Sequence, residues 1–156
     1  MNIYVFKIAL FHEKRIYRKI AIEKDKMLSN LHETIFHSFD RYDNAHLYTF
    51  YFPAKRSQST SVIRGSLQYT HPFNYEQNYR GLDVGLDVGD ASEKSVGSLN
   101  LEFKQKFYYL FDFRDEWWHE ITFEKTVEND GGEYPRILLK KGESPPQYQE
   151  NEDWYE

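Results

Sequence analysis

The sequence predicts an α+β protein in which a largely antiparallel sheet packs on one main helix. Residues 3–11 and 15–23 are strand-like and are separated by a short polar turn, which is typical of an N-terminal hairpin. Apolar residues then recur at helical spacing between residues 26 and 39. A second, aromatic hairpin is predicted within residues 107–127. Because 156 residues is an ordinary domain length, we expect a single domain over residues 1–156.

The first half of the chain has the clearest patterns. Residues 3–11 are apolar on both faces, as expected of a strand in the middle of a sheet. We expect Asp25 to cap the helix, because its short side chain can accept the free amide hydrogens of the first turn. The apolar stripe that should pack on the sheet consists of Leu28, Leu31, Ile35 and Phe39. A third strand over residues 46–52 ends before Pro53.

The middle and the end of the chain are less regular. Residues 53–95 are rich in Ser, Gly, Asn, Gln and Asp, which predicts a loop-rich variable insert with one strand near residues 62–69. A short edge strand is expected at 96–101 and an extended segment at 134–140. The acidic tail, residues 143–156, is nearly devoid of aliphatic side chains; we expect it to be disordered or to dock through its aromatic residues.

The aromatic hairpin carries the main candidate site. A turn over residues 114–117 would place Phe113 opposite Trp118 and Asp112 opposite His119. A carboxylate beside an imidazole can serve as a general-base dyad, because it fixes the tautomer and raises the basicity of the ring. The alternative is a structural pair that satisfies two polar groups at the edge of the core.

Composition limits the function classes. The sequence has no cysteine, so disulfides, thiolate nucleophiles and cysteine-ligated zinc are excluded. The net charge of −5 argues against generic binding of nucleic acid, which depends on cations that contact phosphates. No apolar run approaches the length of a membrane span. We therefore expect a soluble cytoplasmic protein without a membrane partner and without a cofactor.

Several motifs together resemble one family. They are Ile16 to Ile20, Leu28 to His32 with Phe39, Tyr42 to Leu47 with Phe50, Tyr134-Pro135-Arg136 and Pro145-Pro146. The most specific one is Tyr109 to His119, which is similar to Tyr-x-Tyr-Asp-Phe-Gly-Asp-x-Trp-x-His. With these motifs the chain resembles the plasmid pRiA4b open-reading-frame-three family, some members of which are described as passenger proteins of insertion elements. The resemblance implies an α+β fold and a candidate site, but no reaction.

The chain departs from the family pattern at two places. Arg114 replaces the family's Gly in the hairpin turn, so the positive-φ geometry that Gly allows is not expected at that residue. After Pro146, the chain has Gln147-Tyr148-Gln149 where the family commonly has acidic residues and Gly-Gly. A function that needs this family loop is therefore not implied.

Three functional hypotheses follow. The first is a non-enzymatic binding or accessory module, associated with mobile elements, whose partner is a protein or a small molecule. Its aromatic and acidic groove would be formed by Tyr42, Asp43, His46, Tyr48, Asp112, Asp115, Trp117 and His119, with Trp118 near by. We expect Trp117 rather than Trp118 to be the functional aromatic residue, because Trp118 should pack on a sheet face.

The other two hypotheses require more of the sequence. A metal-dependent hydrolase or nuclease would use His46, Asp112, Asp115 and His119, although no local ligand spacing supports such a site. Weak DNA binding would use the short basic cluster Lys14, Arg15, Arg18 and Lys19. Neither is favoured over the binding module.

Overall fold

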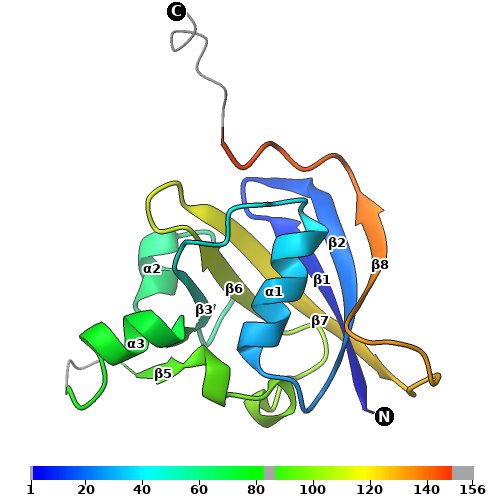
Figure 1. Ribbon diagram of the computed structural model, residues 1–156, viewed down its shortest axis with the longest axis horizontal. Helices are drawn as coiled ribbons and strands as arrows, with labels where there is room; N and C mark the ends of the chain where they lie inside the picture. Colours follow the sequence, from blue (N-terminus) through cyan, green and yellow to red (C-terminus); the bar gives the residue numbers. More distant parts are fainter. Residues whose placement is uncertain (1, 83–86, 149–156) are drawn as a thin grey trace, which may run out of the picture.

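The computed structural model describes residues 2–82 and 87–148 (Figure 1). Within these residues, eight strands form one sheet in the order β5-β4-β3-β6-β7-β1-β2-β8. The strands are β1 (Ile3–Leu10), β2 (Glu13–Glu23), β3 (Tyr48–Phe52), β4 (Leu67–Thr70), β5 (Val88–Asp90), β6 (Lys106–Phe111), β7 (Trp117–Val127) and β8 (Arg136–Lys141). Only the β4–β5 pair is parallel among the described strands. The predicted antiparallel sheet is confirmed, and it is larger than predicted.

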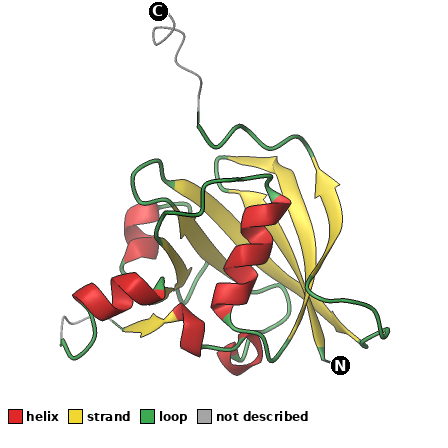
Figure 2. Cartoon of the chain, in the orientation of Figure 1, coloured by secondary structure: helices red, strands yellow, loops and turns green. Residues whose placement is uncertain are grey.

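One helix, α1 (Leu28–Ser38), lies across a face of this sheet (Figures 1 and 2). All four residues of the predicted apolar stripe are buried. The prediction that Asp25 caps the helix is wrong, because the N-cap is Met27, whose amide donates to the side chain of Asn30 at 2.9 Å. The other helical segments are α2 (Thr60–Arg64), α3 (Pro72–Asn78) and the 3₁₀ turns η1 (Ala91–Glu93) and η2 (Val96–Leu99).

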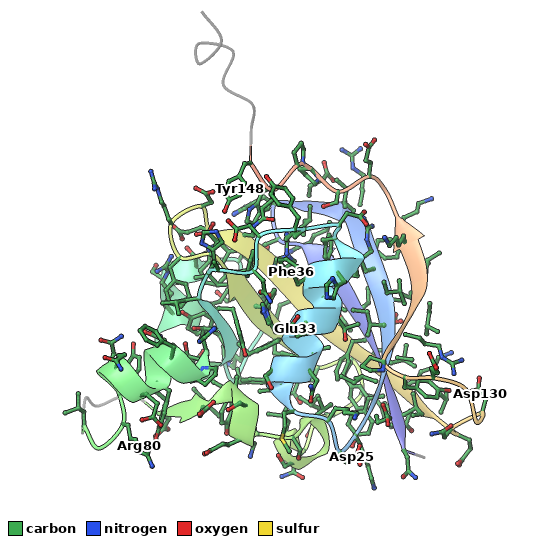
Figure 3. The ribbon with its side chains drawn as sticks, viewed as in Figure 1. Asp25, Glu33, Phe36, Arg80, Asp130 and Tyr148 are labelled. Carbon is green, nitrogen blue, oxygen red and sulfur yellow. The ribbon has the colours of Figure 1, made fainter. Side chains whose placement is uncertain are left out.

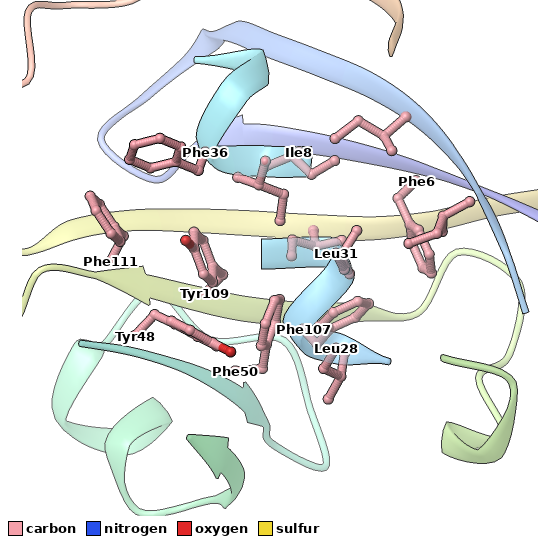
Figure 4. Close-up of a cluster of buried hydrophobic side chains, with 14 of the residues drawn as sticks. Phe6, Ile8, Leu28, Leu31, Phe36, Tyr48, Phe50, Phe107, Tyr109 and Phe111 are labelled. Carbon is pink, nitrogen blue, oxygen red and sulfur yellow. The ribbon is translucent and has the colours of Figure 1, made fainter. Parts of the chain in front are cut away.

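The sheet is buried on both faces near its middle. On the face beneath α1, aromatic side chains of β3 and β6 meet apolar residues of the helix; Figure 4 shows Phe50, Phe107, Tyr109 and Phe111 with Leu28 and Leu31. On the opposite face, Ile63 of α2 packs against Tyr108, Leu110 and Trp118. Alternate residues of the β6–β7 hairpin thus enter two separate apolar clusters, as the two-residue period of strands requires.

The segment from residue 53 to residue 95 is more regular than its composition predicts. It contains α2, β4, α3, β5 and η1, and both of its strands join the main sheet. The single strand expected near residues 62–69 is instead the end of α2 followed by β4. The prediction of an edge strand over residues 96–101 is also wrong, because Val96–Leu99 is a 3₁₀ turn. The short helix α2 is capped by Ser59, whose hydroxyl accepts the Val62 amide.

Arg18 ties the helix to the far edge of the sheet. Its side chain is 1% exposed, and Nε donates to the Ser38 carbonyl at 2.6 Å, near the end of α1. Nη1 donates to the carbonyls of Tyr17, Lys141 and Gly142 at 2.9 to 3.1 Å. This guanidinium fixes the point where β8 ends and the chain turns back over the sheet.

None of the helices in the described ranges is long and apolar enough to cross a membrane.

Candidate functional site

The pairing of β6 with β7 places the hairpin turn earlier than predicted. Phe111 and Trp117 are the last pair before the turn, and Trp117 is the first residue of β7. His119 lies opposite Tyr109, so the predicted pairing of His119 with Asp112 is wrong. Trp118 lies opposite Leu110 rather than Phe113, which corrects the other predicted pair. The observed register differs from the predicted one by an odd number of residues. Relative to β6, the side chains of β7 therefore lie on the sheet face opposite to the predicted one.

Asp112 begins the turn instead of ending a strand. Its φ is 63°, and that of Glu116 is 53°. The Glu116 amide donates to the Asp112 carbonyl at 2.7 Å. Oδ1 of Asp112 accepts the amides of Arg114 and Asp115 at 3.0 and 3.3 Å. An Asp side chain that bonds its own turn tolerates this left-handed conformation, so the chain makes a tight turn without the family's Gly.

His119 is a core residue. Its side chain is fully buried, and its ring packs against Phe39 at 5.2 Å between centroids. Nδ1 lies 3.1 Å from the Tyr109 carbonyl and Nε2 lies 2.8 Å from Nη2 of Arg41. Since a carbonyl only accepts and a guanidinium only donates, Nδ1 carries the proton and Nε2 accepts. Burial, together with the charge of Arg41, lowers the pKa of His119 well below its usual value, so this imidazole is neutral.

Arg41 is a buried residue that sequence reasoning missed. It is 5% exposed, and its guanidinium lies 5.0 to 5.5 Å from the ring centroids of Phe39, Phe111 and Trp117. Burial lowers the pKa of Arg41 to about 10. Nη1 has no hydrogen-bond partner among the described residues. Arg41 stands in a turn-forming sequence that has no periodicity, so no pattern could mark it as buried.

The C-terminal segment, residues 143–148, returns over this end of the sheet. Gln147 anchors it: Oε1 accepts the amides of Tyr42 and Asp43 at 3.0 Å each, and Nε2 donates to the Asp43 carbonyl at 2.8 Å. The Tyr148 ring, which is labelled in Figure 3, meets the Tyr42 ring edge-on with 5.9 Å between centroids. The first part of the predicted acidic tail is therefore docked, whereas residues 149–156 of the prediction lie outside the described residues.

A polar network lies behind the docked segment. The Tyr148 hydroxyl donates to Oδ2 of Asp43 at 2.8 Å and also contacts Nε2 of His46. Nδ1 of His46 lies 3.6 Å from Oδ2 of Asp112, an oxygen that is buried and accepts no hydrogen bond within the described chain. Partial burial, the bond to Asp43 and the charges of Asp43, Asp112 and Asp115 raise the pKa of Tyr148 to about 12. Three carboxylates thus make the potential here negative.

These contacts leave a groove of about 680 Å³ beneath the docked segment. We call it the aromatic groove, and it is lined by Tyr42, Asp115, Trp117, Pro145, Pro146, Gln147 and Tyr148. The Tyr42 ring is 72% exposed. Trp117 is half-buried, and its indole N–H has no acceptor among the described residues. The Asp115 carboxylate has no hydrogen bond or ion pair within the described chain.

The eight predicted groove residues therefore separate into three groups. Tyr42, Asp115 and Trp117 line the groove, while Asp43, His46 and Asp112 form the network behind it. Tyr48 and His119 are in the core. Tyr48 stacks on His32 at 3.8 Å, and Nδ1 of His32 is bonded to the Tyr109 hydroxyl at 2.6 Å. Burial lowers the pKa of His32 to about 3.

The structure does not assemble the hypothetical metal site. His119 lies in the core, and both of its ring nitrogens are occupied by other partners. Across residues 2–82 and 87–148, no three His, Asp or Glu side chains are close enough together to hold a metal ion. The hydrolase or nuclease hypothesis therefore loses the geometry that it needs.

The basic cluster proposed for DNA binding is also dispersed. Arg18 is buried between the end of α1 and the end of β8, as described above. Arg15 is paired with Glu13 at 2.8 Å, and Lys14 lies 3.5 Å from the carboxylate of Glu120. Lys19 lies 3.1 Å from Glu124. Arg18 cannot reach a phosphate, so this hairpin does not present the cluster that the sequence suggests.

The comparison with family models agrees with the resemblance that the hairpin motif Tyr109 to His119 indicates. The model of the plasmid pRiA4b ORF-3-like proteins matches residues 2–156. The chain belongs to this family. The match includes the Asp112 turn and the docked C-terminal segment, so the site described above lies wholly within the family region.

Individual relatives do not supply an activity. The chain is 26% identical over 104 residues to the uncharacterized protein y4hQ of Sinorhizobium fredii, covering 62% of this chain and 54% of y4hQ. It is 25% identical over 126 residues to two biosynthetic arginine decarboxylases of Prochlorococcus marinus, covering 81% of this chain and 17% of each decarboxylase. The chain thus spans about half of y4hQ and a small part of the decarboxylases.

A solved structure has the same fold. The crystal structure of MM3350, a protein of unknown function from Methanosarcina mazei Go1, matches with a TM-score of 0.67. The match covers 94% of this chain and 72% of MM3350, at 18% sequence identity. At this identity, the likeness concerns the fold alone.

Proposed function

We propose that this family member is a non-enzymatic binding module whose aromatic groove takes a Lys- or Arg-bearing segment of a partner protein. The observation that carries the proposal is the meeting of the exposed Tyr42 ring, the half-buried Trp117 ring and the unpaired Asp115 carboxylate in one groove. Aromatic faces attract cations, and a carboxylate adds a charged hydrogen-bond acceptor. An accessory role in mobile elements belongs to this proposal, since the family is named after a plasmid reading frame.

The electrostatics support a cationic partner over an anionic one. Asp43, Asp112 and Asp115 all raise the pKa of the Tyr148 hydroxyl, which borders the groove. A ligand with negative charge would meet the same three carboxylates and would be repelled. Arg41 is buried 5.2 Å from the Trp117 ring centroid and is not part of the groove lining, so a ligand in the groove would not contact its guanidinium directly.

The test is a selection from a display library of random peptides on the immobilised protein, followed by titration of the enriched peptides by tryptophan fluorescence. We expect the enriched peptides to carry Arg or Lys, and their affinity to fall at least tenfold in Trp117→Ala and Asp115→Asn. The matched control is Asp25→Asn, which removes the same charge at the opposite end of the molecule (Figure 3). Enrichment that is equal on wild type and Trp117→Ala would refute the proposal.

A further inference from the structure

A second groove lies at the other end of the β6–β7 hairpin and has the opposite charge. It encloses about 800 Å³ between the loop that follows β3 and the segment that joins η2 to β6. The cations that line it are Lys55, Arg56, Lys94, Lys104 and Lys106, and Glu102 is the only carboxylate in the lining. The aromatic groove adjoins Trp117, whereas this one adjoins Lys106 at the start of β6, so the two are separate.

This groove continues onto the sheet. A neighbouring hollow of about 550 Å³ shares Lys104 and Lys106 with it. The hollow adds Lys7, Lys19 and Lys125, with Glu124 as its one carboxylate. We call the two hollows together the basic groove. Its lining has eight cations and two carboxylates, on a chain whose net charge is −5. Arg56 is paired with the buried Glu120 at 3.1 Å, and Lys19 with Glu124 at 3.1 Å.

Several of these cations are not neutralised by the protein. The side chains of Lys55, Lys104 and Lys125 are exposed and make no hydrogen bond or ion pair within the described chain. Lys106 donates to the Thr122 hydroxyl at 2.6 Å and lies 3.8 Å from Glu120. Partial burial lowers the pKa of Lys106 against the opposing effect of Glu120, and neighbouring cations lower it further. Crowding of like charges of this kind is relieved when an anion binds.

An exposed aromatic ring stands at the edge of the cations. Phe103 lines the basic groove and is 66% exposed. One face of its ring stacks on Phe123 at 5.4 Å and 20°, which leaves the other face toward solvent. The next residue, Lys104, has a φ of 68° and donates its amide to the Phe123 carbonyl at 2.7 Å. The ring is therefore held in place as a platform, next to an unpaired cation.

We propose that the basic groove binds single-stranded nucleic acid, with phosphates along the lysines and a base stacked on Phe103. Grooves that bind single strands combine cations along the backbone with aromatic rings that accept any base. In a duplex the bases are already stacked and cannot reach Phe103, so the geometry favours a single strand. This inference does not rest on the proposed peptide site, and variants of the aromatic groove should leave it unaffected.

The test is fluorescence anisotropy of a labelled twelve-nucleotide oligo(dT) and oligo(U), with the intact protein at several salt concentrations. Wild type should bind both, with an affinity that falls as salt rises. Lys104→Ala with Lys125→Ala should weaken binding roughly tenfold and reduce the salt slope by roughly 1.4, about 0.7 for each phosphate contact. The matched control removes two exposed cations elsewhere, Arg15→Ala with Arg114→Ala, and should change neither value.

Phe103→Ala separates stacking from charge. It should weaken oligo(dT) binding roughly tenfold, as loss of one stacked base implies, while the salt slope stays the same. Thermal unfolding of each variant verifies that the fold is kept, which is expected because the three replaced side chains are exposed. The inference is overturned by any of three results: no binding at low salt, equal loss in the control variant, or equal competition by polyglutamate or by a duplex of the same length.

Discussion

The side-chain amide of Gln147 pairs with the backbone of Asp43 on both sides: Oε1 accepts the Asp43 amide at 3.0 Å and Nε2 donates to the Asp43 carbonyl at 2.8 Å. Gln147 is 5% exposed, so these bonds are shielded from water. They hold the C-terminal segment over Trp117 and thereby form one wall of the aromatic groove. The groove therefore depends on a side chain far from the aromatic hairpin in the sequence.

Replacing Gln147 should open this wall while the sheet stays intact. Gln147→Ala removes all three bonds, and Gln147→Glu keeps acceptors but places a carboxylate against the Asp43 carbonyl near three other carboxylates. Both variants should speed hydrogen exchange at the amides of Tyr42 and Asp43 at least tenfold. Amides of β1 should exchange as in wild type. Unchanged protection at Tyr42 and Asp43 in both variants would show that the segment is held by other contacts.

The buried His32 should make stability depend on pH. Its pKa is lowered to about 3 by burial, below the value near 6.5 of an unfolded chain. Above pH 6.5 the imidazole is neutral in both the folded and the unfolded chain, and the free energy of unfolding has its full value. As the pH falls from 6.5 toward 3, the unfolded chain binds a proton that the folded chain does not, so the free energy of unfolding decreases. Between pH 7 and 5 the loss from His32 is about 2 kcal/mol, and His119 acts in the same direction.

Urea unfolding at pH 7 and pH 5 measures this effect. His32→Gln should lower the free energy of unfolding at pH 7 but reduce its change between the two pH values. His37→Gln serves as the control, because the His37 side chain is 68% exposed at the solvent side of α1. A difference between pH 7 and pH 5 that is the same in wild type and His32→Gln would contradict the assignment of a neutral, buried His32.

The elements that could be predicted from the sequence are those with a sustained period. The apolar stripe of α1 and the alternation in β2 are long enough to fix both element type and buried face, whereas β1 and β7 could be predicted as strands without their buried faces. The hairpin register could not be predicted in the same way, because it depends on two positive-φ residues, Asp112 and Glu116, that no periodicity marks. The aromatic run before residue 114 and the alternation after residue 117 predict a turn over residues 114–117, which is shorter than the observed one and places His119 in the site instead of the core.

The candidate site was only half predictable for a related reason. Asp115 and Trp117 could be predicted because they lie on the hairpin turn, where residues of binding sites are common, and Tyr42 because it begins a motif of the family. Arg41 and Gln147 were missed because polar residues in irregular segments look solvated. In the fold, each is buried through bonds to residues distant in sequence. Such contacts depend on tertiary structure and have no local signature.

Arg18 should be required for stability. Its guanidinium supplies donors to four carbonyls from β2, α1 and the end of β8, and three of these carbonyls lie in other elements or loops. Arg18→Met keeps most of the apolar stem but leaves the carbonyls without these donors, so it should cost ~3 kcal/mol or more of unfolding free energy. Arg15→Met, on an exposed side chain of the same strand, should cause little change in urea unfolding. Equal effects of the two substitutions would show that the Arg18 bonds contribute nothing.

The two adjacent tryptophans should respond differently to substitution. Trp118 is 4% exposed, stacks on Tyr51 at 5.7 Å and donates from Nε1 to Glu116 at 3.2 Å. Trp118→Ala should therefore cost ~3 kcal/mol or more in urea unfolding, as for other large-to-small changes in a core. Trp117 is half-buried under the C-terminal segment, so Trp117→Ala should cost appreciably less.

Trp117→Phe distinguishes packing from recognition at this site. The Trp117 indole N–H is buried without an acceptor in the described chain, so removing it should leave stability within about 0.5 kcal/mol of wild type. Phe keeps part of the aromatic ring that contacts Arg41 and lines the groove, so peptide binding should be weakened rather than abolished, in contrast to Trp117→Ala. If Trp117→Ala and Trp118→Ala destabilise the protein equally and peptide binding survives in Trp117→Ala, Trp117 is a core residue and the aromatic groove is not a binding site.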